Sequence, residues 1–295
     1  MTEHHINAIG LLLMRLLAQL PLPCVRALGS LLGHALHALA GRRRRIARTN
    51  WTVCFPQMPS AQRNKAVRRH FVCFAQAWLD RSWLWHGSAE TIRRRLRLNG
   101  AVEAFHGQTP TVIFAPHFVG LDAGWTALTA QIDRRFCTIY IEQLNKAVDR
   151  WILAGRQRYG QPHTVPRRQG LKPLVTALRA GEPLYLLPDM DYGAADSVFV
   201  PFYSVPTATI TSLSRFARLA DAQVVPVISR LTPQGYEVTV LPPWDGFPSD
   251  DAVADTAHMN ARLQDMIASM PEQYFWVHKR FKTRPPGEAS IYGQD

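Results

Sequence analysis

Cysteine is scarce in this sequence, and its spacing matches no metal or disulfide framework. The four cysteines are scattered, with no CxxC pair and no histidine at zinc-finger spacing, which argues against structural zinc and against a disulfide scaffold. The bulk of the protein is therefore expected in a reducing compartment, without a metal site. A GxSxG motif is also absent, and no cysteine lies beside a recognisable histidine, so the sequence offers no candidate for a covalent nucleophile.

A long uninterrupted apolar run is missing too. Two leucine-rich stretches, over residues 9–20 and 24–41, are interrupted by Arg15 and Arg26 and separated by prolines. A membrane-spanning helix needs roughly 20 apolar residues, and no small-residue cleavage site follows the first stretch, as a secretory signal would require. The leucines recur at helical spacing, which predicts a helical hairpin that lies in or on a bilayer. The alternative is a hairpin packed on the protein's own core.

Lysine is scarce although positive charge is not. Basic residues number 34 against 22 acidic ones, giving a net charge of +12, and because only five are Lys, 29 are Arg. The planar guanidinium suits phosphate and carboxylate recognition, so phospholipids, an acidic protein and nucleic acid all fit, unless the genome simply favours Arg codons. The densest block, Arg42–Arg45, directly follows the apolar hairpin. An apolar anchor next to basic charge predicts binding to anionic headgroups, and a solvated basic face is the alternative.

The composition indicates a folded chain. With 47% hydrophobic and 19% charged residues, it is too apolar for a disordered basic tail and too charged for a polytopic membrane protein. Residues 61–98 predict amphipathic helices with aromatic side chains in the core. Apolar runs predict strands at residues 111–115, 138–141, 184–187, 224–228 and 236–241. Helical stretches lie between them, so we expect an α/β fold with a mostly parallel central sheet flanked by helices. The predicted parts are an N-terminal membrane anchor, residues 1–45, and one catalytic domain, residues 46–295.

A histidine and an acid stand five positions apart in PHFVGLD, directly after the first predicted strand. On one regular helix His117 and Asp122 would lie about 140° apart. They can meet if His117 is on the loop and Asp122 in the first turn of the next helix, with Gly120 allowing a tight turn, at the sheet edge where α/β folds carry active sites. The carboxylate would then fix the imidazole tautomer, so that the other ring nitrogen can take a proton from a hydroxyl. Alone, HxxxxD is a weak pattern that also fits a structural histidine.

Six segments in order resemble one family across nearly the whole chain. They are RRRRIARTNWTVCFP, PHFVGLD, GRQR, LLPDMDYG, SVFVPFY and EQYFWVHKRFKTRP. Together they resemble the bacterial late acyltransferases of lipid A, the lauroyl and myristoyl transferases within the lysophospholipid acyltransferase superfamily. The resemblance implies that residues 46–295 form a single acyltransferase domain.

The resemblance also implies roles by position. His117 matches the catalytic histidine, and Asp122 matches its acidic partner, which is commonly Glu in the lipid A enzymes and Asp in the glycerolipid enzymes. Asp122 therefore leaves the acceptor class more open. The implied substrate-binding residues are Arg156 and its neighbour Arg158, Asp189, and Asp191 beside it.

Physical chemistry gives the charged residues two interpretations each. Arg156 can clamp a phosphate or the phosphopantetheine of a donor, or it can form a structural ion pair with Asp189. Asp189 itself ends a predicted strand at the sheet edge, or it anchors a loop or caps a helix. The cluster His278, Lys279, Arg280, Lys282 and Arg284 near the end of the chain can steer an acidic carrier protein or sugar phosphates, or it is merely a solvated basic end.

The resemblance and the residues together predict direct acyl transfer. His117 would take the proton of a lipid hydroxyl, and the alkoxide would attack the thioester of acyl-acyl carrier protein, with no further cofactor. The implied partners are acyl carrier protein, a lipid A precursor and the cytoplasmic face of the inner membrane. Another acceptor of the superfamily, a lysophospholipid, an ornithine lipid or another glycolipid, is the alternative. A nucleic-acid-binding protein would need arginines interleaved with stacking aromatics, and the densest Arg block lies beside the apolar hairpin instead.

Overall fold

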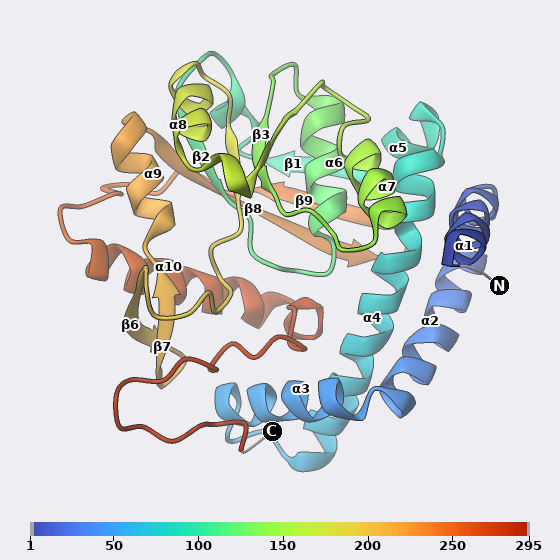
Figure 1. Ribbon diagram of the computed structural model, residues 1–295, viewed down its shortest axis with the longest axis horizontal. Helices are drawn as coiled ribbons and strands as arrows, with labels where there is room; N and C mark the ends of the chain where they lie inside the picture. Colours follow the sequence, from blue (N-terminus) through green and yellow to red (C-terminus); the bar gives the residue numbers. More distant parts are fainter. Residues whose placement is uncertain (1–2, 294–295) are drawn as a thin grey trace.

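The computed structural model describes residues 3–293, which are built around a seven-stranded sheet (Figure 1). The strand order is β1-β9-β8-β2-β5-β3-β4, and every neighbouring pair is parallel except β8 and β9. The strands are β1 (Leu96–Gly100), β2 (Thr111–Phe114), β3 (Cys137–Tyr140), β4 (His163–Pro166), β5 (Leu184–Leu186), β8 (Gln223–Thr232) and β9 (Gly235–Val240). The predicted mostly parallel α/β fold and all five predicted strands are confirmed.

Four strands escaped the sequence analysis. Residues 61–98 are not helical throughout, because β1 begins at Leu96 and forms one edge of the sheet, and β4 forms the other edge. Edge strands contain both polar and apolar residues, such as Arg97 beside Leu96 in β1. No continuous apolar run in the sequence therefore identifies them. The antiparallel hairpin of β6 (Ser197–Phe202) and β7 (Val205–Ile210) lies apart from the main sheet.

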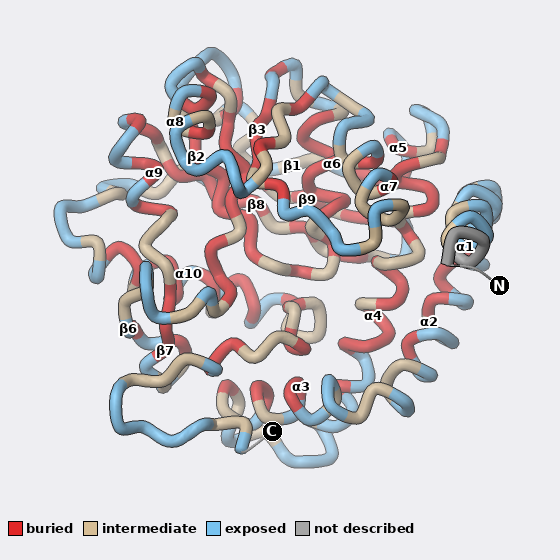
Figure 2. The backbone as a smooth tube through the Cα atoms, viewed as in Figure 1, coloured by how far each residue is buried: buried red, intermediate tan, exposed pale blue. Residues whose placement is uncertain are grey.

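Alternate residues of the central strands pack into two cores, one on each face of the sheet. In β2, Val112 and Phe114 join a core covered by α8, α9 and α10, while Ile113 joins one covered by α6 and the second half of α4. These strands are the buried centre of the molecule (Figure 2). The helices are α4 (Ser60–His86), α5 (Ala89–Arg95), α6 (Leu121–Gln131), α7 (Lys146–Arg156), α8 (Lys172–Arg179), α9 (Ser212–Ala220) and α10 (Ala252–Ser269).

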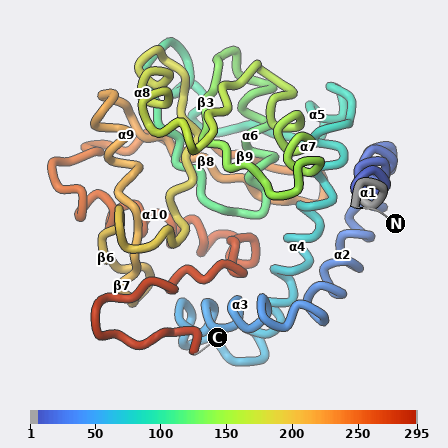
Figure 3. The backbone as a smooth tube through the Cα atoms, viewed as in Figure 1, coloured from blue at the N-terminus to red at the C-terminus, as the bar shows by residue number. Residues whose placement is uncertain are grey.

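The first helices, α1 (Glu3–Leu17), α2 (Leu22–Leu39) and α3 (Gly41–Cys54), pack beside α4 (Figure 3). Glycine lets α2 approach closely, since a Cβ on Gly33 would lie 2.5 Å from the Val72 Cα. A buried ion pair also joins them, because Arg26 of α2 lies 3.0 Å from the fully buried carboxylate of Asp80 in α4. One side of the hairpin is therefore packed on the protein's own core, as the alternative to membrane binding predicted.

The other side of this hairpin is apolar and exposed. Ile9, Leu12, Leu13, Leu16, Leu20, Leu28, Leu31, Leu32 and Leu39 have large exposed fractions. Among residues 3–293, no helix combines the length and the apolar character needed to cross a bilayer. The predicted boundary after residue 45 falls inside α3, and the membrane anchor stays a prediction.

The two predicted basic clusters are partly used inside the fold. Arg44 donates to the carbonyls of His37 and Ala38 at the end of α2. Arg280 is almost fully buried and donates to the Ala208 carbonyl at 2.8 Å. The prediction of a surface cluster at the end of the chain is therefore wrong for Arg280, whose guanidinium holds the β6–β7 hairpin.

A buried histidine should make stability depend on pH. His70 of α4 is fully buried and bonds the Glu272 carbonyl through Nδ1 at 3.0 Å. Burial lowers the pKa of His70 to about 4, although that hydrogen bond opposes the shift. Because the unfolded chain binds the proton more readily, the stability that neutral His70 contributes is present above pH 6.5 and is lost as the pH falls toward 4. Acid should therefore weaken the fold well above the range in which carboxylates titrate.

We expect His70→Asn to reduce this dependence, since the amide still donates to Glu272 but does not titrate. Between pH 7 and pH 5 the wild-type protein should lose about 2 kcal/mol more free energy of unfolding than the variant. Denaturant titrations at both pH values measure the difference. His278, whose pKa burial also lowers to about 4, contributes equally to both proteins. An identical pH dependence in the two would contradict the prediction.

Candidate active site

The two central strands β2 and β5 end side by side, and each is followed by a residue of the site, a histidine after β2 and an aspartate after β5. Phe114 lies opposite Leu186 in the parallel register, and the Ala115 amide donates to the Leu186 carbonyl at 2.9 Å. His117 follows β2 and Asp189 follows β5. Parallel strands present their carboxyl ends at one sheet edge, so residues 72 positions apart meet there.

The carboxylate of Asp189 holds His117 at two points. Asp189 Oδ1 lies 2.7 Å from His117 Nδ1, and Oδ2 accepts from the His117 backbone amide at 3.0 Å. Asp189 is fully buried, which alone would raise its pKa, but the charge and hydrogen bonds of His117 outweigh burial and the net pKa is lowered. An ionised carboxylate on Nδ1 fixes the proton there and leaves Nε2 as the acceptor nitrogen.

The end of the chain supports this loop. The Phe275 amide donates to the His117 carbonyl at 2.9 Å, and its ring stacks on the imidazole with centroids 6.4 Å apart. The Tyr274 hydroxyl donates to the Asp189 carbonyl at 3.3 Å. The segment EQYFW therefore helps to hold both His117 and Asp189 in place.

Asp122 has different partners from those predicted. It lies in the first turn of α6, as expected, but Oδ1 accepts from Arg156 Nε at 2.9 Å and Oδ2 from Arg81 Nε at 2.7 Å. The prediction that Asp122 orients the imidazole is therefore wrong, because Asp189 occupies that place. The alternative ion pair between Arg156 and Asp189 is wrong for the same reason.

The two guanidinium groups keep Asp122 ionised. Burial would raise its pKa, but the charges of Arg156 and Arg81 and their hydrogen bonds lower it to about 2. The carboxylate in turn fixes both guanidinium groups, whose side chains are 23% exposed in Arg81 and 25% exposed in Arg156, and of the two only Arg156 lines the cavity around His117. Two partly exposed cations held in this way suit an anionic group of a substrate.

Gly120 is needed for packing and not for an unusual backbone turn. Its φ is −85°, which any residue adopts. A Cβ would instead lie 2.9 Å from the Ser229 carbonyl oxygen and 2.9 Å from the Tyr236 ring. The expected role of Gly120 in a tight turn is therefore replaced by a close approach of α6 to the sheet.

Arg81 was missed by the sequence analysis. It lies in α4 between aromatic residues, 4.7 Å from the Trp78 ring centroid and 5.7 Å from that of Trp85. The aromatics were assigned to the core and no chemistry was attached to their neighbours. The available signal was an acid–base pair, Asp80 and Arg81, inside the mostly apolar second half of α4.

Two other predicted site residues lie elsewhere. Arg158 donates to the carbonyls of Leu84 and Gly87 at the end of α4 and does not line the cavity around His117. Asp191 accepts from the Thr283 amide at 2.7 Å and from its hydroxyl, so it anchors the C-terminal segment. The structure therefore brings together His117, Asp122, Arg156 and Asp189, and it separates Arg158 and Asp191 from them.

A cavity of about 700 Å³ extends from this polar group. The histidine, acidic and basic residues in its wall are His117, Asp122, Arg156, Arg167, Asp196 and Arg215, and the larger part of the wall is apolar. Apolar lining residues include Ile139, Val165, Leu171, Leu174, Leu186, Ile210, Phe216, Leu219 and Phe275. An apolar cavity with a few convergent polar groups suits a ligand with a hydrocarbon chain and a reactive polar end.

Comparison with known proteins identifies the family of this chain. Residues 1–283 match the family described as bacterial lipid A biosynthesis acyltransferase. Lipid A biosynthesis lauroyltransferase of Escherichia coli K12 is 33% identical, over 96% of this chain and 94% of that protein. The myristoyltransferase of lipid A biosynthesis from the same strain is 30% identical, over 88% of this chain and 82% of that protein. The crystal structure of the 1-acyl-sn-glycerophosphate acyltransferase PlsC from Thermotoga maritima covers 83% of this chain and 97% of its own, with 14% identity and a TM-score of 0.39. The resemblance drawn from the six sequence segments is confirmed, and the chain belongs to the bacterial lipid A biosynthesis acyltransferase family.

Proposed function

We propose that this protein transfers a fatty acyl chain from acyl-acyl carrier protein to a hydroxyl of a lipid A precursor. The observation that carries the proposal is the His117–Asp189 pair at the polar end of an apolar cavity of about 700 Å³. The cavity suits an acyl chain, and the pair suits proton transfer from a hydroxyl at its end. Membership of the family supports the acceptor class.

The reaction proceeds without a covalent enzyme intermediate. Nε2 of His117 takes the proton of the acceptor hydroxyl, and the oxygen forms a bond to the thioester carbon. The carbon–sulfur bond then breaks, and the leaving thiolate takes the proton from the imidazolium. Asp189 stays ionised throughout and stabilises the charged ring. The atoms and charges of the reaction balance without a further cofactor.

Arg156, which lines the cavity, binds an anionic group of the substrate, while Arg81 holds the other carboxylate oxygen of Asp122. Arg156 keeps N–H donors beyond the one that it gives to Asp122, because a guanidinium has five. A phosphate of the glucosamine disaccharide and the phosphopantetheine phosphate of the donor both have the required charge. Asp122 acts as a positioning residue for these two cations.

Contact with the cytoplasmic face of the inner membrane explains the apolar face of α1 and α2. The exposed leucines of these helices adjoin the start of α3, where Arg42, Arg45 and Arg48 are exposed. Apolar area together with basic charge supplies the two signals of stable interfacial binding. This location also brings the cavity close to a lipid acceptor.

The direct test is a transfer assay with purified protein. We expect incubation with acyl carrier proteins of several chain lengths and a tetra-acylated or penta-acylated disaccharide to give a product heavier by one acyl chain in mass spectra. Omitting the acceptor controls for plain thioester hydrolysis. No acylated disaccharide with any donor, together with unchanged lipid A in a deletion strain, would reject the lipid A assignment in favour of another lipid acceptor.

A further inference from the structure

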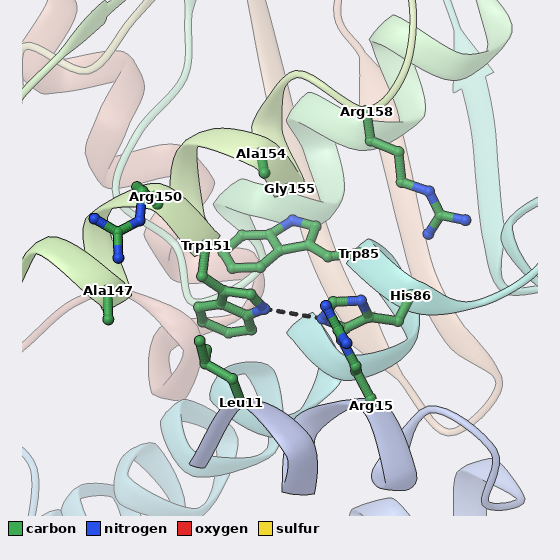
Figure 4. Close-up of a pocket in the computed structure, with 10 residues that line it drawn as sticks. All are labelled: Leu11, Arg15, Trp85, His86, Ala147, Arg150, Trp151, Ala154, Gly155 and Arg158. Atoms are coloured by element: carbon green, nitrogen blue, oxygen red, sulfur yellow. Dashed lines mark hydrogen bonds between the residues drawn. The ribbon is translucent and has the colours of Figure 1, made fainter. Parts of the chain in front are cut away.

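A second cavity, of about 440 Å³, lies between α1, the end of α4 and α7 (Figure 4). It shares no lining residue with the cavity around His117. We call it the α1–α7 groove, and its lining residues are Leu11, Arg15, Trp85, His86, Ala147, Arg150, Trp151, Ala154, Gly155 and Arg158. The acyl-transfer site does not use it.

Three arginines, Arg15, Arg150 and Arg158, give the groove a positive charge. Arg150 and Arg158 lie on opposite sides of two indole rings, and Arg15 lies next to His86 (Figure 4). No acidic residue lines the groove, and within the described part of the chain Arg15 and Arg150 pair with no carboxylate. Although Arg150 also acts electrostatically on the neighbouring Asp149, that carboxylate does not line the groove. Two exposed arginines at a concave site with no acidic lining residue favour an anionic ligand.

The floor of the groove is aromatic and rigid. The rings of Trp85 and Trp151 meet edge to face with centroids 4.4 Å apart. Trp151 Nε1 donates to His86 Nε2 at 2.9 Å, which requires a neutral His86, and burial and Arg15 lower the pKa of that histidine. Gly155 closes the floor, because a Cβ there would lie 2.3 Å from the Trp85 ring. Such an aromatic surface can pack against the apolar part of a ligand whose charged group contacts the arginines.

The groove opens beside the exposed apolar face of the molecule. Arg15 is in the last turn of α1, and Leu12 and Leu16 of the same helix are each 56% exposed. The Asn7 and Asn145 side chains exchange hydrogen bonds of 3.0 Å and 3.3 Å, which ties α1 to the start of α7. A ligand between these helices therefore contacts cations and exposed leucines together. A lipid has both the anionic group and the apolar chains for these contacts, whereas a soluble anion has only the charge.

We propose that the α1–α7 groove binds the phosphate headgroup of an anionic phospholipid, a bilayer component that is not a substrate. Arg15 and Arg150 contact the phosphate, and the acyl chains follow the exposed leucines of α1. The inference rests on the proposed membrane contact of α1 and α2. Because α7 carries Arg150 on the groove and Arg156 in the acyl-transfer cavity, a bound lipid also fixes the helix that positions Arg156.

Vesicle binding tests the proposal. Full-length Arg15→Gln/Arg150→Gln is compared with wild type on vesicles of phosphatidylcholine alone and of phosphatidylcholine mixed with phosphatidylglycerol. We expect about tenfold weaker binding to the mixed vesicles and unchanged binding to phosphatidylcholine, since each basic contact at an anionic surface contributes severalfold. Arg93→Gln/Arg94→Gln removes the same charge from the exposed end of α5, outside the groove, and should weaken binding much less.

A second variant tests the site without removing any cation. Ala154→Glu places a carboxylate in the groove between Arg150 and Arg158, and it should also lose the phosphatidylglycerol-dependent binding. Equal losses in the groove and control variants would overturn the proposal in favour of general surface charge. A higher KM for the phosphorylated disaccharide or for acyl carrier protein, with vesicle binding intact, would reassign the groove to that substrate. Acyl transfer in detergent without phospholipid should be unchanged in Arg15→Gln/Arg150→Gln, so failure here is distinct from failure of the proposed function.

Discussion

Asp189→Asn is expected to lower kcat for acyl transfer by about 10³-fold to 10⁴-fold, nearly as much as His117→Ala. The amide can donate to Nδ1, which would move the ring proton to Nε2, the nitrogen that must accept the hydroxyl proton. It also removes the charge that stabilises the imidazolium. Since both residues act as one unit, the double variant should be no slower than His117→Ala alone. Steady-state rates with saturating donor and acceptor measure all three.

Asp191→Asn is the matched control for this prediction. Asp191 is two positions away in the same loop, but it binds the Thr283 amide and hydroxyl. Its loss should reduce thermal stability and lower kcat by less than about tenfold, because no contact to His117 is removed. A larger effect for Asp191→Asn than for Asp189→Asn would contradict the assignment of Asp189 as the partner of the imidazole.

The sequence was sufficient to place His117 but not to find its carboxylate. The run at residues 111–115 predicted β2, and the loop position of His117 followed from it. Asp122 was predicted as the partner from the HxxxxD spacing and from the family motif that PHFVGLD resembles. Asp189 meets His117 only because β5 lies directly beside β2 in the sheet, and strand order depends on tertiary packing that no local pattern records.

The buried arginines were hidden for a related reason. A charged residue in an amphipathic pattern is assigned to the surface, yet Arg81 is only partly exposed and pairs with Asp122, and Arg280 is almost fully buried in the β6–β7 region. Their acceptors come from segments far away in the sequence, so the cost of burying the guanidinium groups is offset only after the chain has folded. The same argument applies to Arg26, which meets Asp80 across two helices.

Arg156→Ala is expected to lower kcat/KM by about 10²-fold to 10³-fold, because a cation held at the mouth of the site loses its anionic substrate group. The fold should persist, since Arg81 still pairs with Asp122 at 2.7 Å. Arg156→Lys should recover only part of the activity, because an ammonium lacks the planar fork that can bind Asp122 and a phosphate together. Arg93→Ala, at an exposed position that lines neither cavity, should leave kcat/KM within about twofold.

The anion that Arg156 binds can be identified by removing one phosphate at a time. If it is a phosphate of the acceptor, the deficit of Arg156→Ala should shrink toward wild type when a dephosphorylated disaccharide replaces the phosphorylated one, and the deficit should appear mainly in the KM for that acceptor. If it is the phosphopantetheine of the donor, the deficit should persist with both acceptors and appear in the KM for acyl carrier protein. A deficit confined to kcat and equal for all substrates would show that Arg156 acts only through Asp122 on the fold of the site. Because Asp122 and Asp189 hold separate partners, that outcome would still leave the His117–Asp189 pair as the group that moves the proton.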